Sequence, residues 1–186
     1  MKKYIGLVLV AMSGCILTVN AQQSFSYKNP LLPTELRVND LLGRMTLEEK
    51  IAQIRHLHSW DVFDGQILNQ EKLDKMCGGI GYGFFEGFPL TAASCRKTFR
   101  EIQTYMVEKT RLGIPGFPVA ESLHGVVHEG TTIYPQNIAM GSTFNPELAY
   151  EKTKHIAGEL NTMGVKQVLA PCIDVVRDLR WGRVEE

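Results

Sequence analysis

Short apolar runs alternate along this chain with longer stretches in which apolar residues recur every three or four positions. The short runs are typical of buried strands, and the longer stretches are typical of helices packed on one side. This alternation predicts an α/β fold in which parallel strands are joined by helices. In chain order we expect a helix over residues 34–44, a strand over 80–85, a helix over 91–111, a strand over 117–120, a helix over 145–163 and a strand over 165–170.

The expected helices carry residues that favour helix ends. Thr46 and Glu49 form the pattern of a capping box, in which both side chains accept hydrogen bonds from free backbone N–H groups of the first turn. Asn69 is a second capping residue, and Asn145 before a proline is a third. The helix after Thr46 is expected to carry its apolar residues on one face, namely Leu47, Ile51 and Ile54.

The first residues predict export. Two lysines precede an almost wholly apolar run from Tyr4 to Val19, and the small residue Ala21 follows. This is the pattern of a secretory signal peptide over residues 1–21, so we expect a periplasmic or secreted protein. Lipoprotein processing at Cys15 is an alternative, which the apolar residues after the cysteine disfavour. The run is short for a membrane span, and no span is expected.

Residues 22–34 are polar and contain prolines, which predicts a surface extension before a folded part over 35–186. The 20 basic and 20 acidic residues balance, so the chain lacks the charge excess typical of proteins that bind nucleic acid or anionic membranes. Three cysteines follow the signal peptide, and their spacing fits no zinc pattern. We expect all three to be small buried apolar residues: Cys77, Cys95 and Cys172.

The densest cluster of polar side chains follows the last expected strand. Residues 177–183 read Arg-Asp-Leu-Arg-Trp-Gly-Arg, and Asp174 stands just before them. Arginine offers several donors in a fixed fork that suits sugar hydroxyls or a carboxylate, and an indole can lie against the C–H face of a sugar. Each arginine can equally brace the loop, and Asp174 can face a ligand or anchor an arginine. The chain stops soon afterwards, and we expect it to be part of a longer protein.

A second polar cluster, Glu121-Ser-Leu-His-Gly125, follows the strand expected over 117–120. Both clusters therefore follow strands, and the loops after strands carry the active site of a (β/α)₈ barrel. A carboxylate and a histidine at a strand end are candidates for binding hydroxyl groups or a metal. Two threonines and a Tyr-Pro turn over Thr131–Gln136 can line a site or pack onto the sheet.

A metal site is the alternative interpretation of the histidines. His124 and His128 are four residues apart, a spacing that places two imidazoles on one face of a helix. However, Gly125 disfavours a helix there, and the HExxH order of zinc hydrolases is absent from the sequence. We therefore expect no metal. His56 and His58 are interpreted as a surface or packing pair.

Several segments of the chain match one known family in register. They are Leu42–Gln53, Glu121–Gly125, Ile133–Gln136, Phe144–Glu147 and Ala170–Glu186. In order and approximate spacing these segments resemble the family 3 glycoside hydrolases, and the resemblance covers residues 35–186. The Arg-Asp-x-Arg-Trp-Gly-Arg run is its most specific part, although Leu179 stands where the family usually has proline.

The resemblance implies a fold and an activity. Family members have an N-terminal (β/α)₈ barrel followed by an α/β sandwich, so residues 35–186 are expected to form the incomplete first part of a TIM-type barrel. They release β-linked sugars from non-reducing ends with retention of configuration, and β-D-glucose is the expected sugar here. Retention requires two carboxyl groups. The family's nucleophile and acid/base match no residue up to Glu186, so the chain alone is expected to be inactive.

The resemblance also implies roles for single residues. The family's substrate-binding carboxylate falls on Glu121, and its sugar-binding arginine falls on Arg177. The remaining matched side chains are expected to build loops rather than hold the sugar: His124, Asp178, Arg180, Trp181 and Arg183. The implied substrate is an oligosaccharide or an aryl β-glycoside, and no cofactor is expected.

Two other functions stay open. A non-catalytic sugar-binding module built from the same residues would bind a monosaccharide without turning it over. A metal-dependent hydrolase would use Glu121, His124 and His128. The sequence leaves the choice among glucose, xylose and N-acetylglucosamine open, and also the oligomeric state.

Overall fold

The computed structural model describes residues 26–87 and 91–185, which divide into two compact units between Arg44 and Met45. The predicted signal peptide over residues 1–21, with Cys15, lies outside the described residues. The division falls after helix α1 (Thr34–Arg44), within the folded part expected over residues 35–186. The reason is that α1 packs with the turn that precedes it in the chain.

The N-terminal unit contains the 3₁₀ turn η1 (Ser26–Lys28) and α1, a helix that the sequence predicted correctly. Asp40 of α1 joins the two elements. Its carboxylate accepts a hydrogen bond from the backbone N of Tyr27 at 3.0 Å and another from Nε of Arg44 at 2.9 Å. Tyr27 is buried, and its carbonyl oxygen accepts a further bond from Nε of Arg37 at 2.9 Å. These polar contacts hold the turn against the helix.

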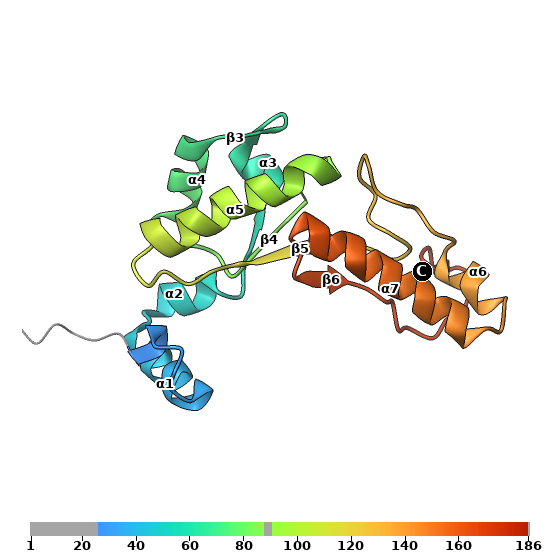
Figure 1. The fold of residues 1–186 in the computed structure, drawn as a ribbon, viewed down its shortest axis with the longest axis horizontal. Helices are drawn as coiled ribbons and strands as arrows, with labels where there is room; N and C mark the ends of the chain where they lie inside the picture. The colour runs from blue at the N-terminus through green and yellow to red at the C-terminus, as the bar shows by residue number, and fades with distance from the viewer. Residues whose placement is uncertain (1–25, 88–90, 186) are drawn as a thin grey trace, which may run out of the picture. The chain divides into compact units, whose positions relative to one another are not determined.

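Four parallel strands form the centre of the second unit (Figure 1). They are β1 (His56–His58), β4 (Phe84–Glu86), β5 (Phe117–Glu121) and β6 (Gln167–Leu169), paired in that order. The order in the sheet equals the order in the chain, so each connection crosses over and returns to the same end of the sheet, as parallel strands require. The predicted α/β class with a parallel sheet is confirmed. A small antiparallel hairpin, β2 (Phe63–Asp64) with β3 (Ile67–Leu68), lies outside this sheet.

The helices of this unit begin and end largely where the sequence predicted. The capping box at Thr46 is present, and the side chains of Asn69 and Asn145 accept hydrogen bonds from backbone N–H groups at the starts of two further helices. Gly78 and Gly164 end those two helices in the left-handed conformation that glycine adopts easily. The helices are α2 (Leu47–Ala52), α3 (Ser59–Val62), α4 (Gln70–Cys77), α5 (Ala92–Lys109), α6 (Asn137–Gly141) and α7 (Pro146–Met163).

The core lies between the sheet and the two long helices. Leu57 of β1 and Phe85 of β4 are fully buried, and Phe85 makes an edge-to-face contact with Phe99 of α5, with ring centroids 5.7 Å apart. Ile156 and Leu160 bring the inner face of α7 into the same cluster. Figure 1 shows α5 beside β4 and α7 along β6. Among the described residues, no helix combines the length and the apolar content needed to cross a membrane.

The cysteines follow the prediction in part. Cys77 and Cys95 are buried in this core, and burial raises the pKa of the first thiol to about 12 and of the second to about 11. They are therefore protonated packing residues and not reactive thiolates. Cys172 is only partly buried, because it lies on the loop that follows β6.

The strand predicted over residues 80–85 is misplaced, since β4 begins only at Phe84. Gly81 has a positive φ of 77°, which takes the backbone out of the extended conformation. Gly83 packs directly on backbone, because a Cβ built there would lie 1.8 Å from the carbonyl oxygen of Gln53. A glycine thus allows two backbone segments to approach closely just before the strand.

The apolar face predicted after Thr46 does not form. Helix α2 ends at Ala52, before Ile54, and the three residues of that face are exposed in the described structure: Leu47, Ile51 and Ile54. The buried side of α2 carries Glu49 and Ala52 instead. The burial of Glu49 has a physical cause, which is its ion pair with an arginine after α5.

Candidate functional site

The carboxyl ends of the first three parallel strands bring His58, Glu86 and Glu121 to one edge of the sheet. His58 and Glu86 are direct partners in the β1–β4 register. In the next pair Phe85 lies opposite Pro118, which places Glu86 opposite Val119, two residues before Glu121. Side chains alternate along a strand, so these side chains share one face. Ligands of parallel α/β sheets bind at this edge.

A cavity of about 370 Å³ opens at this edge. Its polar lining includes Glu86 and Glu121, together with His58 and His128, and the indole of Trp60 also lines it. Apolar side chains from the sheet and the long helices supply the rest, among them Phe99, Val119, Met163 and Val165. Small-molecule sites have volumes of roughly 300–1,000 Å³ and combine apolar walls with a few polar groups. The cavity therefore suits one small polar ligand.

Glu86 is fixed by two imidazoles. Its Oε2 lies 3.1 Å from Nδ1 of His56, and its Oε1 lies 3.4 Å from Nδ1 of His58, the second contact lacking hydrogen-bond geometry. The ring of His58 in turn stacks on Trp60, with centroids 4.4 Å apart and an angle of 7° between the planes. The predicted packing pair of histidines is real, and its partner is a carboxylate at the cavity.

The loop after β5 carries unsatisfied polar atoms beside Glu121. The Oγ of Ser122 and the Nδ1 of His124 are buried and have no hydrogen-bond partner among the described residues. The backbone there is well held, because the carbonyl oxygen of His124 accepts a bond from the N of Tyr134 at 2.7 Å. Buried polar atoms without partners are rare, since each forfeits its hydration. The loop therefore has hydrogen-bonding capacity left for a ligand or water.

His128 lines the cavity on the same loop. Burial lowers the pKa of its imidazole below the usual value of 6.5, which favours the neutral ring. The alternative metal triad of Glu121, His124 and His128 is not assembled. Within residues 26–87 and 91–185, no group of three or more His, Cys, Asp or Glu side chains is arranged to hold a metal ion.

The segment Thr131–Gln136 packs as a loop. The hydroxyl of Thr131 accepts a bond from the N of His128 at 3.3 Å, and it donates to backbone carbonyl oxygens of the same loop. The hydroxyl of Thr132 donates to Oε1 of Glu159 in α7 at 2.6 Å. These two threonines anchor the loop after β5 and are not placed at the cavity.

The loop after β6 carries an internal ion pair. Asp178 accepts hydrogen bonds from the backbone N of Arg180 and from its Nε, both at 2.9 Å. The bond from the side chain of Arg180 is the largest cause that lowers the pKa of Asp178, and the bond from the backbone of Arg180 is the next. Both side chains are exposed. An arrangement of this kind braces a loop. Asp174 accepts a bond from Sγ of Cys172 at 3.2 Å.

The structure does not bring the C-terminal cluster to the cavity. Among the described residues that line it, none comes from the segment 174–183. Arg177, Trp181 and Arg183 are all exposed on the loop after β6. Glu121 is therefore the predicted sugar-binding residue that the structure places at the cavity, and Arg177 is the one that it does not.

Sequence reasoning missed three lining residues, His58, Trp60 and Glu86. A signal was available, because each stands at or directly after the carboxyl end of a strand. The signal was weak since β1 and β4 are three residues long, too short to show an alternating pattern.

A parallel α/β sheet with a carboxylate-lined cavity at the carboxyl ends of its strands is the arrangement in which barrel-type proteins bind small molecules. Residues 46–186 match the N-terminal domain of glycosyl hydrolase family 3. The chain belongs to this family, as its motifs predicted.

Known relatives agree with this assignment. The chain is 29% identical over 186 residues to a periplasmic β-glucosidase of Salmonella typhimurium, an alignment that covers 99% of this chain and 22% of the relative. It is 42% identical over 82 residues to a β-xylosidase of Formosa agariphila, covering 41% and 11% of the two chains. A solved β-glucosidase from Erythrobacter marinus has a TM-score of 0.73 at 29% identity, covering 88% and 22%. The two β-glucosidases match most of this chain. This chain, in contrast, spans only about a fifth of the length of each of them.

Proposed function

We propose that residues 45–186 form the first part of the sugar-binding barrel of an exported β-glycosidase, and that the carboxylate of Glu121 holds hydroxyl groups of the sugar. The observation that carries this proposal is the position of Glu121, at the end of β5 and in the wall of a cavity of about 370 Å³. Membership of glycosyl hydrolase family 3 supports the chemistry. The relative named as a periplasmic enzyme supports export.

A carboxylate at this position suits a sugar. When ionised it only accepts hydrogen bonds, and its two oxygens can take two neighbouring hydroxyl groups. Such charge-assisted bonds are shorter and stronger than neutral ones. The apolar side chains of Val119 and Met163 in the same cavity offer contact to the C–H groups of the ring and displace water from it.

Bond cleavage with retention needs two carboxyl groups flanking the glycosidic oxygen, one as nucleophile and one as acid and base. We assign neither role to a residue of this chain. Glu86 is held between two imidazoles, and Glu121 is assigned to sugar binding. Both catalytic carboxyl groups are proposed to come from sequence beyond residue 186.

Arg177 is proposed to contact the sugar in a protein of full family length. It lies exposed on the loop directly after β6, the neighbour of β5 in the sheet. A guanidinium donates hydrogen bonds, whereas Glu121 accepts them, so the two side chains would bind hydroxyl groups in complementary ways.

The sugar is proposed to be β-D-glucose, with β-D-xylose as the second candidate, because relatives of both names match the chain. The two sugars differ by the hydroxymethyl group of glucose. The ratio of kcat/KM for an aryl β-glucoside to that for an aryl β-xyloside therefore measures how well the site accommodates and hydrogen-bonds the hydroxymethyl group.

The test is p-nitrophenol release from both aryl glycosides by the 186-residue chain and by a protein whose reading frame is extended past codon 186. We expect turnover by the extended protein alone, faster on the glucoside. In that protein, Arg177→Ala should lower kcat/KM by roughly tenfold or more, since a charged hydrogen bond contributes about 1.5–3 kcal/mol. Lys109→Ala, an exposed cation at the end of α5, is the matched control and should leave kcat/KM unchanged.

The outcomes separate the alternatives. Turnover by the 186-residue chain would contradict the assignment of the catalytic groups. Sugar binding without turnover in the extended protein would favour a non-catalytic sugar-binding module. Unchanged kinetics in Arg177→Ala would contradict the role of that arginine.

A further inference from the structure

Two aromatic rings line the cavity that holds Glu121, those of Phe99 and Trp60. Phe99 is buried, whereas Trp60, in the short helix α3 that follows β1, is 67% exposed. Exposing a large apolar indole to water is unfavourable, and aromatic side chains in the walls of cavities commonly contact ligands.

The orientation of this indole is fixed by its neighbours. One of its faces stacks on His58 at a centroid distance of 4.4 Å, nearly parallel. This stacked imidazole sets the plane of the indole before any ligand arrives. A ligand therefore meets a surface whose ordering cost is already met.

We propose that Trp60 is a stacking platform for a sugar ring in the cavity of Glu121, and that His58 is a positioning residue that holds the indole flat. A pyranose ring has an apolar C–H face and a rim of hydroxyl groups. The indole contacts the C–H face, and the carboxylate of Glu121 accepts hydrogen bonds from the hydroxyl groups of the rim. This inference rests on the proposed function, because it names a further specificity-determining residue of the same site.

The chain offers a matched control for this platform. Tyr150 on α7 is a second aromatic residue, 68% exposed, and it lies outside the cavity lining. Trp60→Ala and Tyr150→Ala therefore remove aromatic side chains of equal exposure, and only the first removes a wall of the cavity.

The test is calorimetric titration of the 186-residue chain and its variants with methyl β-D-glucoside and methyl β-D-xyloside. Trp60→Ala should raise Kd roughly five- to tenfold, in line with the strength of aromatic stacking contacts. Trp60→Phe, which keeps a smaller ring, should lie between this variant and the parent. Tyr150→Ala should bind as the parent does. Circular dichroism confirms that each variant is folded.

Two outcomes would overturn the inference. If Trp60→Ala binds as tightly as the parent while Glu121→Gln binds more weakly, the platform is wrong and the proposed function stands. If the parent itself binds neither glycoside, the platform is wrong, whereas turnover by the extended protein decides the proposed function separately.

The positioning role of His58 is tested separately. His58→Ala should weaken binding as Trp60→Ala does, because the indole loses the ring on which it stacks, and His58→Phe should restore part of the affinity by keeping a stacked ring. Equal loss of affinity in His58→Ala and His58→Phe, at unchanged thermal stability, would contradict this role.

Discussion

Gly83 lies where three segments of backbone meet. Its N donates to the carbonyl oxygen of Ala52 at 3.0 Å, and its own carbonyl oxygen accepts from the N of Phe117 at 2.7 Å. A Cβ at this position would lie 1.8 Å from the carbonyl oxygen of Gln53. The contact is with backbone that is itself hydrogen-bonded, so a side-chain rotation cannot relieve it.

We predict that Gly83→Ala destabilises the chain by about 3 kcal/mol through this overlap. Gly158 in the middle of α7 is the matched control, because nothing lies within 4 Å of a Cβ built there. Gly158→Ala should stabilise by roughly 0.5–1 kcal/mol, the helical cost of glycine. Urea unfolding measures both, and equal stabilities for the two variants would contradict the packing at Gly83.

His128 predicts a pH dependence of stability. Burial lowers the pKa of its imidazole in the folded chain below 6.5, so the unfolded chain takes up this proton first as the pH falls. Its contribution to stability is therefore complete above about pH 6.5 and is lost below it. His128→Gln should flatten the fall in the free energy of unfolding between pH 7 and 5. A slope identical to that of the parent would show that the ring is solvated.

At the residue scale, sequence could predict Glu121 but not its companions at the cavity. Glu121 was found because its motif resembles that of a known family and because it ends a five-residue strand. Glu86 ends a strand of three residues, and Trp60 lies just after another strand of that length. The closeness of Glu86 and Trp60 depends on the β1–β4 register, which only long-range pairing sets. Arg177 was assigned from its motif, and its contact with a sugar stays a prediction.

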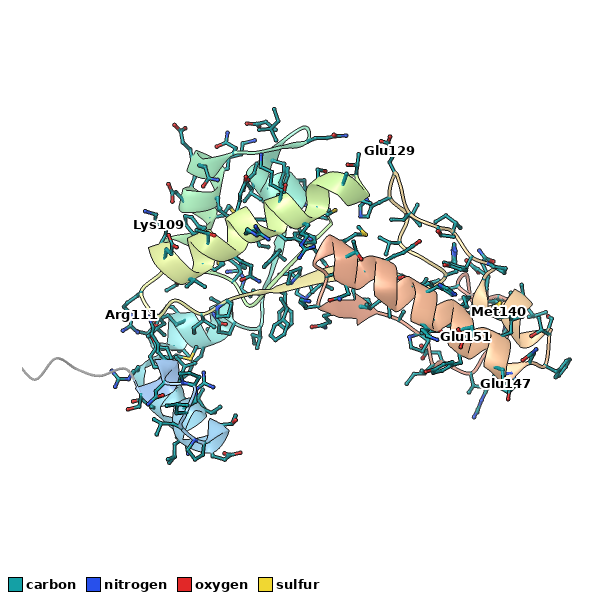
Figure 2. The ribbon with its side chains drawn as sticks, viewed as in Figure 1. Lys109, Arg111, Glu129, Met140, Glu147 and Glu151 are labelled. Atoms are coloured by element: carbon teal, nitrogen blue, oxygen red, sulfur yellow. The ribbon has the colours of Figure 1, made fainter. Side chains whose placement is uncertain are left out.

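At the scale of elements, helix α2 is tied to the end of α5 by an ion pair. Glu49 is 2% exposed, and its Oε1 accepts a bond from Nε of Arg111 at 2.8 Å, while its Oε2 also accepts from the N of Thr46 at 2.8 Å. Figure 2 shows Arg111 beside α2, past the end of α5 at Lys109. The hydrogen bond from Arg111 is the largest cause that lowers the pKa of Glu49.

The two sides of this pair are predicted to respond unequally to mutation. Arg111→Met leaves a buried carboxylate unpaired and should cost about 2–3 kcal/mol. Glu49→Gln leaves an arginine that is already half exposed and keeps an acceptor for the cap, so it should cost about 1 kcal/mol. Chemical denaturation at pH 7 measures both, and the reverse order would contradict the burial of Glu49.

The ion pair of Glu49 and Arg111 also makes stability depend on pH. Because the pKa of Glu49 is lowered in the folded chain, the contribution of this carboxylate to stability is complete above the ordinary pKa of 4.5. The contribution is lost as the pH falls through the folded-state pKa. In Glu49→Gln this part of the acid-induced loss of stability should be absent.

Element boundaries were predictable where local chemistry decides them. The caps at Thr46, Asn69 and Asn145 need only neighbours within three residues, and all three are present. The face of α2 was not predictable, because a partner 62 residues away decides that Glu49 is the buried side. Periodicity alone favoured Leu47 and Ile51, which are exposed.

At the scale of the whole molecule, four parallel strands in chain order place every loop after a strand at one edge. That topology follows from the alternation of strands and helices along the sequence, and it explains how Glu121 and Glu86, far apart in the chain, come to line one cavity. The loop after β6 shares the edge, yet its residues 174–183 do not line the cavity. We propose that the missing half of the site is supplied by sequence that this chain does not contain.

The most direct test of a sugar site at Glu121 is a titration with methyl β-D-glucoside of the parent chain, Glu121→Gln and Glu129→Gln. Glu129, labelled in Figure 2, is an exposed glutamate on the same loop and is not part of the cavity lining. A lost charge-assisted hydrogen bond should raise Kd roughly tenfold or more in Glu121→Gln and leave Glu129→Gln unchanged. Equal affinities for Glu121→Gln and the parent would contradict a sugar site at the end of β5.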